Sequence, residues 1–164
     1  MADERDRGGE AACWAHLVDA ASPLPDAVLA QLVRDAGDAV VVADPAGFIT
    51  FWNLAAERVF GWPASEAVGQ SLDLIIPERQ RGRHWAGYEA VMATGETRCG
   101  EDLLQVPAVH ADGGRRSIAF TVTLLRDEAG NPSGIAAIIR DETRRWNEER
   151  ALRQRLAELG GPPS

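Results

Sequence analysis

The chain has 164 residues, of which 45% are hydrophobic and 26% charged, and its formal net charge is -8. This length and apolar content suit one globular domain with appended helices. The negative charge repels nucleic-acid phosphates, and no apolar run approaches the roughly 20 residues that cross a bilayer, so neither a nucleic acid nor a membrane is an expected partner. The start of the chain lacks the apolar core of a signal peptide, and two cysteines are too few for a disulfide framework, so the cytoplasm is the expected compartment.

Two helices are predicted before the first strand. Residues 1–10 are charged and glycine-rich and are predicted to be disordered. Residues 11–36 are predicted to form an N-terminal helical cap, with helices at 11–20 and 26–35. The second helix carries an apolar stripe at helical spacing, made of Val28, Leu29, Leu32 and Val33.

From residue 38 the apolar period changes to that of strands. Strands are predicted at 39–43 and 48–52, around the turn Asp44-Pro-Ala-Gly. Three short segments and one long helix are predicted next, at 54–60, 64–68, 72–76 and 78–93.

The remaining pattern is mainly that of strands. Strands are predicted at 102–110, 116–126 and 134–140, and a final helix at 141–159. Alternation in the second of these strands puts four apolar residues on one face, namely Ile118, Phe120, Val122 and Leu124. Two strands, a helical insert and three more strands imply an α+β domain, with one five-stranded antiparallel sheet and helices on one face.

Several motifs occur in order between residues 38 and 145. Asp38 to Asn53 forms the first hairpin, and Asn53-Leu-Ala-Ala-Glu-Arg-Val-Phe-Gly-Trp is similar to an N-x-A-x-x-x-x-x-G-Y core with Trp62 in place of Tyr. Ile76-Pro77, Asp112-Gly113 and Ile138-Ile-Arg-Asp-Glu-Thr follow. Together these motifs resemble the PAS (sensory box) family. The resemblance implies a PAS domain at 37–143, a signalling or dimerisation helix at 144–159 and a tail at 160–164.

The family resemblance implies sensing by binding. PAS domains enclose an apolar cavity between the sheet and the long middle helix, which relatives fill with heme, flavin, small acids or their own side chains. The sequence carries no Ser/His/Asp arrangement, no paired carboxylates and no phosphate-binding loop, so we expect that the protein is not an enzyme. The expected function is that of a single-domain sensory module that binds a small ligand or cofactor.

Flavin photochemistry is not expected. The light-sensing branch of the family carries a reactive cysteine within N-C-R-F-L-Q, on the segment that corresponds to 72–79. Here that segment reads Leu-Asp-Leu-Ile-Ile-Pro-Glu-Arg, and Cys99 lies elsewhere.

Heme is the most specific cofactor hypothesis. The heme-containing PAS gas sensors place an axial histidine seven residues after an Ile-Pro pair, and this position is His84 here. His84, Tyr88 and Val91 share one helix face. The resemblance therefore implies heme b with His84 as axial iron ligand. The predicted cofactor contacts are His84, Tyr88, Val91, Leu104, Ile118, Phe120 and Val122.

The sequence also departs from the heme branch. Gly87 stands where the heme relatives carry Tyr, and Leu104 falls near the place of the arginine that faces the iron in the oxygen-binding branch. Carbon monoxide, nitric oxide or the redox state would then be the signal, rather than oxygen. In the alternative hypothesis, His84 is a partly buried core residue with a backbone partner. The domain would then be a ligand-free module for protein–protein interaction or dimerisation.

The sequence contains two weaker candidate sites. Cys13 and His16 have C-x-x-H spacing, but zinc needs about four ligands and only Cys99 and His110 remain, so a zinc site is not expected. Three arginines alternate at the start of the long helix, and we expect them to be solvated or, with heme, to reach its propionates. They are Arg79, Arg81 and Arg83.

The apolar pattern of the last predicted helix indicates how the protein binds its partners. Leu152, Leu156 and Leu159 form an apolar seam of about two heptads, too short for a stable free coiled coil. We expect a homodimer through the terminal helices, although this helix can instead fold back over its own sheet. No kinase, cyclase or helix-turn-helix segment is recognisable, so a separate effector, a kinase or a regulator, is expected to act in trans.

Overall fold

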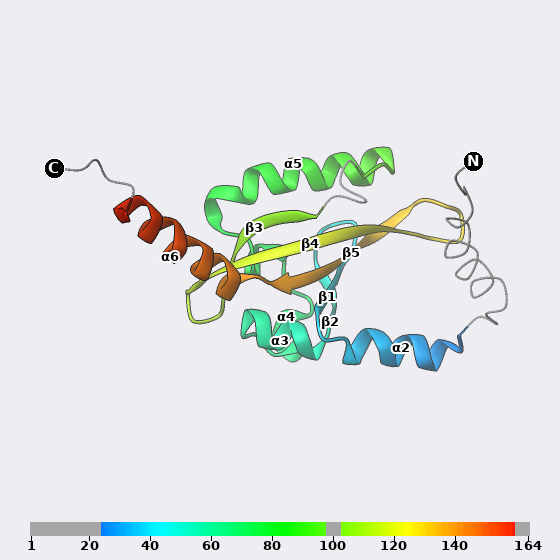
Figure 1. The fold of residues 1–164 in the computed structure, drawn as a ribbon. Coiled ribbons are helices and arrows are strands. Elements are labelled where there is room, and N and C mark those ends of the chain that lie inside the picture. The colour runs from blue at the N-terminus through cyan, green and yellow to red at the C-terminus, as the bar shows by residue number, and fades with distance from the viewer. Residues whose placement is uncertain (1–23, 98–102, 160–164) are drawn as a thin grey trace, which may run out of the picture. The chain divides into compact units, whose positions relative to one another are not determined.

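The computed structural model describes residues 24–97 and 103–159 (Figure 1). The chain divides into two compact units between Leu32 and Val33. This boundary falls inside helix α2 (Asp26–Asp35), whose predicted bounds are confirmed and whose side chains are all exposed. The helix predicted at 11–20 lies outside the described residues.

The second unit contains a five-stranded antiparallel sheet, which confirms the predicted fold class. Its strands are β1 (Ala39–Ala43), β2 (Ile49–Trp52), β3 (Leu104–Val109), β4 (Arg115–Arg126) and β5 (Pro132–Asp141). The order across the sheet is β2-β1-β5-β4-β3, so the first and last strands lie side by side. In this central pair Val41 lies opposite Ala137.

The helical insert connects β2 to β3. It consists of α3 (Leu54–Phe60), α4 (Ala64–Ala67), the 3₁₀ helix η1 (Leu72–Leu74) and α5 (Glu78–Thr94). Asn53 caps α3, because its side chain accepts a hydrogen bond from the amide of Ala56. Gly61 ends α3 with φ +78°, a left-handed conformation that glycine adopts without steric cost. Helix α3 therefore begins and ends as the local sequence predicts.

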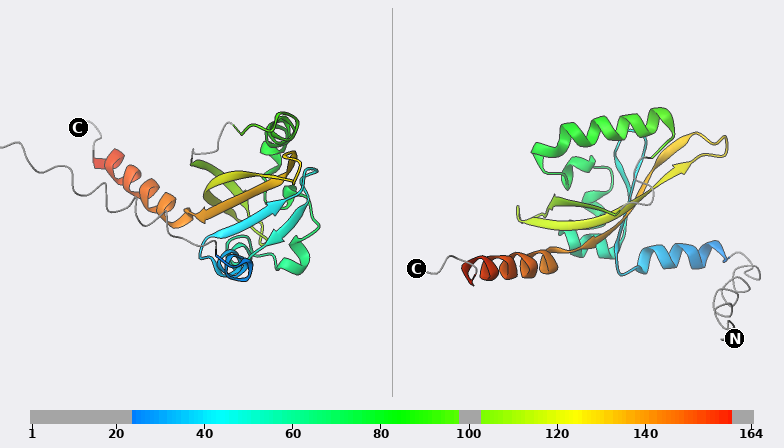
Figure 2. Two further views of the ribbon diagram at one scale, coloured as in Figure 1. Left: turned by 90° about the vertical axis from the view of Figure 1, so that its right-hand side faces the viewer. Right: turned by 45° about the horizontal axis from the view of Figure 1, so that its top comes forward.

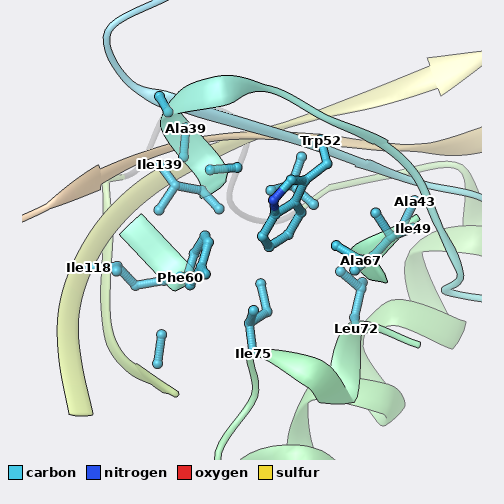
Figure 3. Packing of buried hydrophobic residues seen from close by; sticks show 14 of the residues in the cluster. Ala39, Ala43, Ile49, Trp52, Phe60, Ala67, Leu72, Ile75, Ile118 and Ile139 are labelled. Atoms are coloured by element: carbon cyan, nitrogen blue, oxygen red, sulfur yellow. The ribbon is translucent and has the colours of Figure 1, made fainter. Parts of the chain in front are cut away.

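The core lies between the helical insert and one face of the sheet, which we call the inner face. Alternate residues of a strand point to the same face, which places Ile118, Phe120, Val122 and Leu124 of β4 together as predicted. Phe60 is fully buried and lies beside Ile118 and Ile139 (Figure 3). Burial of one such side chain contributes roughly 1.5–3 kcal/mol.

Helix α6 (Thr143–Leu159) follows β5 directly and leads away from the end of that strand (Figure 2). Its side chains from 150 to 158 are all exposed, so in this unit α6 does not fold back over the sheet. Among the described residues, every helix is too short or too polar to cross a membrane.

Candidate functional site

His84 lies on α5 between two aromatic neighbours of its own helix. Its ring centroid is 4.9 Å from that of Trp85, edge to face, and 5.8 Å from that of Tyr88. The residue is half-buried, and its Nδ1 is buried without a hydrogen-bond partner in the described part of the chain. A buried polar atom without a partner is uncommon in native proteins. This atom is therefore the feature of α5 that most needs an explanation.

Burial controls the charge of His84. Desolvation lowers the pKa of the imidazole below its ordinary value, and the nearby Asp73 carboxylate opposes this shift in part. The ring is therefore neutral at pH 7, which is the form that ligates metals.

The polar groups of Trp85 and Tyr88 form hydrogen bonds with residues outside α5, and not with His84. The Nε1–H of Trp85 donates a hydrogen bond of 2.9 Å to Oδ1 of Asp73. The hydroxyl of Tyr88 donates to the carbonyl oxygen of Asp44 at 2.5 Å, and Tyr88 is only 6% exposed. Because this hydroxyl is already used, Tyr88 has no free donor for a ligand.

Arg81 is partly solvated, with 42% of its side chain exposed, and it also bonds to the chain. Its guanidinium donates to the carbonyl oxygens of Ile76 at 3.2 Å and Asp73 at 3.0 Å. It also forms an ion pair with the Asp73 carboxylate, at 3.5 Å. Arg81 thus folds back onto the segment before α5, because unsatisfied carbonyl groups lie there, whereas Arg79 and Arg83 are exposed.

The predicted cofactor contacts on the sheet fall into two groups, which differ in how deeply the side chains are buried. Leu104 and Phe120 lie directly opposite each other on β3 and β4, and Val122 lies opposite Ala137 on β5. Leu104, Phe120 and Val122 are half-buried, as is Val91 on α5. Ile118, by contrast, is only 4% exposed and packs in the core beside Phe60 (Figure 3).

Sequence reasoning missed the roles of Trp85 and Asp73. Trp85 lies four residues after Arg81 and three before Tyr88, so helical spacing alone places the three on one stripe. The contact with Asp73 joins α5 to η1, and no local pattern signals it. Asn53, which the sequence assigned a structural role, is buried and bonded as expected of such a residue.

The weak zinc hypothesis involves mostly residues outside the described part of the chain. Cys13, His16 and Cys99 all lie there, and His110 forms an ion pair of 2.8 Å with Asp112. Within residues 24–97 and 103–159, no group of three or more histidine, cysteine or acidic residues is placed to hold a metal ion.

Three of the exposed large apolar side chains of this unit lie on α6. Leu152 and Leu156 are 58% and 68% exposed, and Trp146 is 47% exposed with the Arg150 guanidinium over its ring. Ion pairs link Glu149 to Arg145 and to Arg153, both at 3.1 Å. The ion pairs of these charged residues therefore lie within the helix itself, while Leu152 and Leu156 are exposed.

Comparison with known proteins gives relatives that are much longer than this chain. An uncharacterised protein of Azorhizobium caulinodans is 39% identical over 121 residues, which are 73% of this chain and 16% of that protein. The sensor protein FixL of Bradyrhizobium diazoefficiens is 26% identical over 133 residues, 80% of this chain and 26% of FixL. The chain thus spans about a quarter or less of the length of these curated relatives.

Solved structures and family models agree on the fold. The crystal structure of a PAS domain from Colwellia psychrerythraea superposes with a TM-score of 0.63 at 23% identity, covering 72% of this chain and 97% of that domain. The family model of the PAS fold matches residues 28–141, well over half of the chain. The five-stranded sheet, its helical insert and this match together show that the chain belongs to the PAS family of sensory domains.

Proposed function

We propose that this PAS domain senses a small apolar ligand, which it binds between α5 and the inner face of the sheet, and that it acts by binding rather than by catalysis. In the most specific form of this proposal the ligand is heme, held through His84. The observation that carries the proposal is the buried Nδ1 of His84, which has no hydrogen-bond partner in the described chain.

Half-buried apolar residues on the sheet and on α5 support an apolar ligand. Leu104, Phe120 and Val122 belong to the sheet face that carries the core, yet they remain half-buried. Val91, two turns along α5 from His84, is half-buried as well. Burial of this remaining surface by a ligand would be favourable, at roughly 25 cal/mol per Å².

The residues fit heme in two respects. The imidazole is neutral and has an unpartnered ring nitrogen, and the side chains of β3 and β4 that are assigned to the macrocycle are apolar. His84 would hold the iron, while Leu104, Phe120 and Val122 would contact the porphyrin. Bound heme supplies an iron centre that binds diatomic gases or changes its oxidation state. Leu104 offers no hydrogen bond to a bound gas, which favours carbon monoxide, nitric oxide or redox state over oxygen as the signal.

Titration of the full-length chain with hemin tests this form of the proposal. We expect a Soret band typical of histidine-ligated heme in the wild type and in His110→Ala, which removes another partly buried histidine. His84→Ala should lose that band and recover it when imidazole is added, because the vacated space admits the free ligand. An unchanged spectrum of free hemin with the wild type, or equal spectra for His84→Ala and the wild type, would rule out heme bound through His84.

A second candidate rests on α6. We propose, as the alternative, a ligand-free module that forms a homodimer through the exposed seam containing Leu152 and Leu156. In either case the signal passes to an effector, a kinase or a regulator. Sedimentation velocity should show a dimer that Leu152→Asp and Leu156→Asp convert to a monomer, whereas Gln154→Asp on the same helix should not. If the two leucine variants sediment like the wild type, α6 is not the interface.

A further inference from the structure

Two sets of polar contacts meet at Asp38, the residue before β1. One set leads to the N-terminal helix α2, and the other leads to the end of β5. On the N-terminal side the contact is made by Asn53, which is only 3% exposed. Its Nδ2 donates to the carbonyl oxygens of Val33 and Asp38, each at 3.1 Å. Its Oδ1 accepts from the amides of Val40 and Ala56, each at 2.9 Å. All four hydrogen-bonding positions of the amide are used, so one buried side chain fixes the backbone of Asp38 to the last turn of α2.

On the C-terminal side the contact is made by the carboxylate of Asp38. It accepts two hydrogen bonds from the guanidinium of Arg140, from Nε at 3.1 Å and from Nη2 at 2.6 Å. Such two-point pairs fix orientation as well as distance. The next residue pair of the same strands, Ala39 opposite Ile139, lies in the core. The ion pair therefore joins the entry to β1 with the end of β5.

The end of β5 leads into α6 without a flexible connection. The amide of Glu142 donates to the carbonyl oxygen of Ser117 at 2.8 Å, and Oγ1 of Thr143 accepts from the amide of Ser117 at 3.0 Å. The amide of Thr143 in turn donates to Oδ1 of Asp141 at 2.8 Å. The first turn of α6 is therefore fixed both to β4 and to the end of β5, so a movement of this edge of the two strands carries it along.

We propose that the Asp38–Arg140 ion pair couples the last turn of α2 to the first turn of α6, so that a change in the order of one helix is transmitted to the other. The side chains of Arg140 and Asp38 are 65% and 34% exposed. Exposed pairs contribute little to overall stability, so this one opens at low cost. A contact that opens easily and lies between the segments that lead to two flanking helices suits a switch better than a structural brace. The coupling needs no ligand and goes beyond the proposed function.

Residue-resolved amide hydrogen exchange of the full chain, measured by NMR, tests the coupling. Asp38→Asn keeps the backbone acceptor for Asn53, and Arg140→Gln leaves α2 untouched. We expect each variant to speed exchange by roughly two- to fivefold in both Val33–Asp35 and Thr143–Trp146. The double variant should exchange no faster than either single variant, because each removes the same contact.

The matched control is Arg153→Gln, which breaks another exposed arginine–carboxylate pair, that with Glu149 on α6. It should leave exchange in Val33–Asp35 unchanged. The proposal is wrong if Arg140→Gln speeds exchange only in Thr143–Trp146, or if the effects of the two single variants add in the double variant. Circular dichroism of each variant shows that the comparison is made between folded proteins.

Discussion

Gly47, in the β1–β2 turn, leaves the space that the indole of Trp85 occupies. A β-carbon at Gly47 would lie 2.2 Å from Cζ3 of that ring, and Gly47 has φ +84°. Both the close approach and the left-handed backbone require glycine here. The turn is thereby held against α5 beside His84, on the side where Tyr88 bonds to Asp44.

Gly47→Ala should therefore destabilise the domain. We expect a loss of roughly 1–3 kcal/mol in the free energy of unfolding, because the ring must move and the backbone is strained. Urea unfolding followed by tryptophan fluorescence measures this loss. Gly87→Ala on α5 is the control, since nothing lies within 4 Å of its added β-carbon. It should stabilise the helix by about 0.5–1 kcal/mol. Equal effects of the two substitutions would contradict the contact between Gly47 and Trp85.

Asn53→Ala should be among the most destabilising single changes in the chain. It leaves two amides and two carbonyl groups without their partner. We expect a loss of roughly 2–4 kcal/mol, since each buried group that remains unsatisfied costs about 1–3 kcal/mol and water satisfies some of them. Chemical denaturation measures the loss. Asn147→Ala, on the exposed surface of α6, should change stability by less than about 0.5 kcal/mol.

The order of elements in this fold could be predicted from sequence because each element carries a local signal. Asn53 and Gly61 mark the ends of α3, and period-two alternation marks β4. The strand order could not be predicted, because the pairing of β1 with β5 joins segments about 100 residues apart. The predicted start of β5, at residue 134, is two residues too late. The strand begins at Pro132, and Gly134 within it leaves room for the carbonyl oxygen of Ala43, 2.4 Å from where a β-carbon would lie.

The candidate site was only partly predictable. Helical spacing placed His84 and Tyr88 on one face of α5, and they are neighbours. Their anchors, Asp73 and the carbonyl oxygen of Asp44, come from other elements, and backbone acceptors carry no sequence signal. The family resemblance implied that His84 ligates heme iron. The hydrogen-bond partners of Trp85 and Tyr88, by contrast, depend on tertiary contacts alone.

Acid should weaken the contribution that Asp38 makes to the stability of the folded domain. The hydrogen bonds from Arg140 hold the pKa of this carboxyl below its usual value, although partial burial opposes the shift. The folded state thus binds the proton less tightly than the unfolded state, so the stabilisation is present above about pH 4 and is lost as the pH falls through the lowered pKa. Asp38→Asn should therefore be less stable than the wild type at pH 7, with a difference that shrinks toward pH 3. Urea unfolding across this range measures the difference, and Arg140→Gln should show the same trend. A difference that does not change with pH would contradict the ion pair.

Alkali should destabilise the domain through Tyr88, the one tyrosine of the chain. Burial, and secondarily the charge of Asp44, raise the pKa of its phenol to about 12. Because the unfolded phenol ionises near pH 10, the folded state holds the proton more tightly, and stability falls as the pH rises from about 10 toward 12. A near-ultraviolet titration reads this group directly. The phenolate band should appear near pH 10 in urea but only well above it in the native protein. Tyr88→Phe should abolish the band and lower stability at pH 7 by about 1 kcal/mol, since the hydrogen bond to Asp44 is lost. A phenolate band near pH 10 in a protein that is still folded would show that the hydroxyl is in water and that α5 is not fixed to the β1–β2 turn through Tyr88.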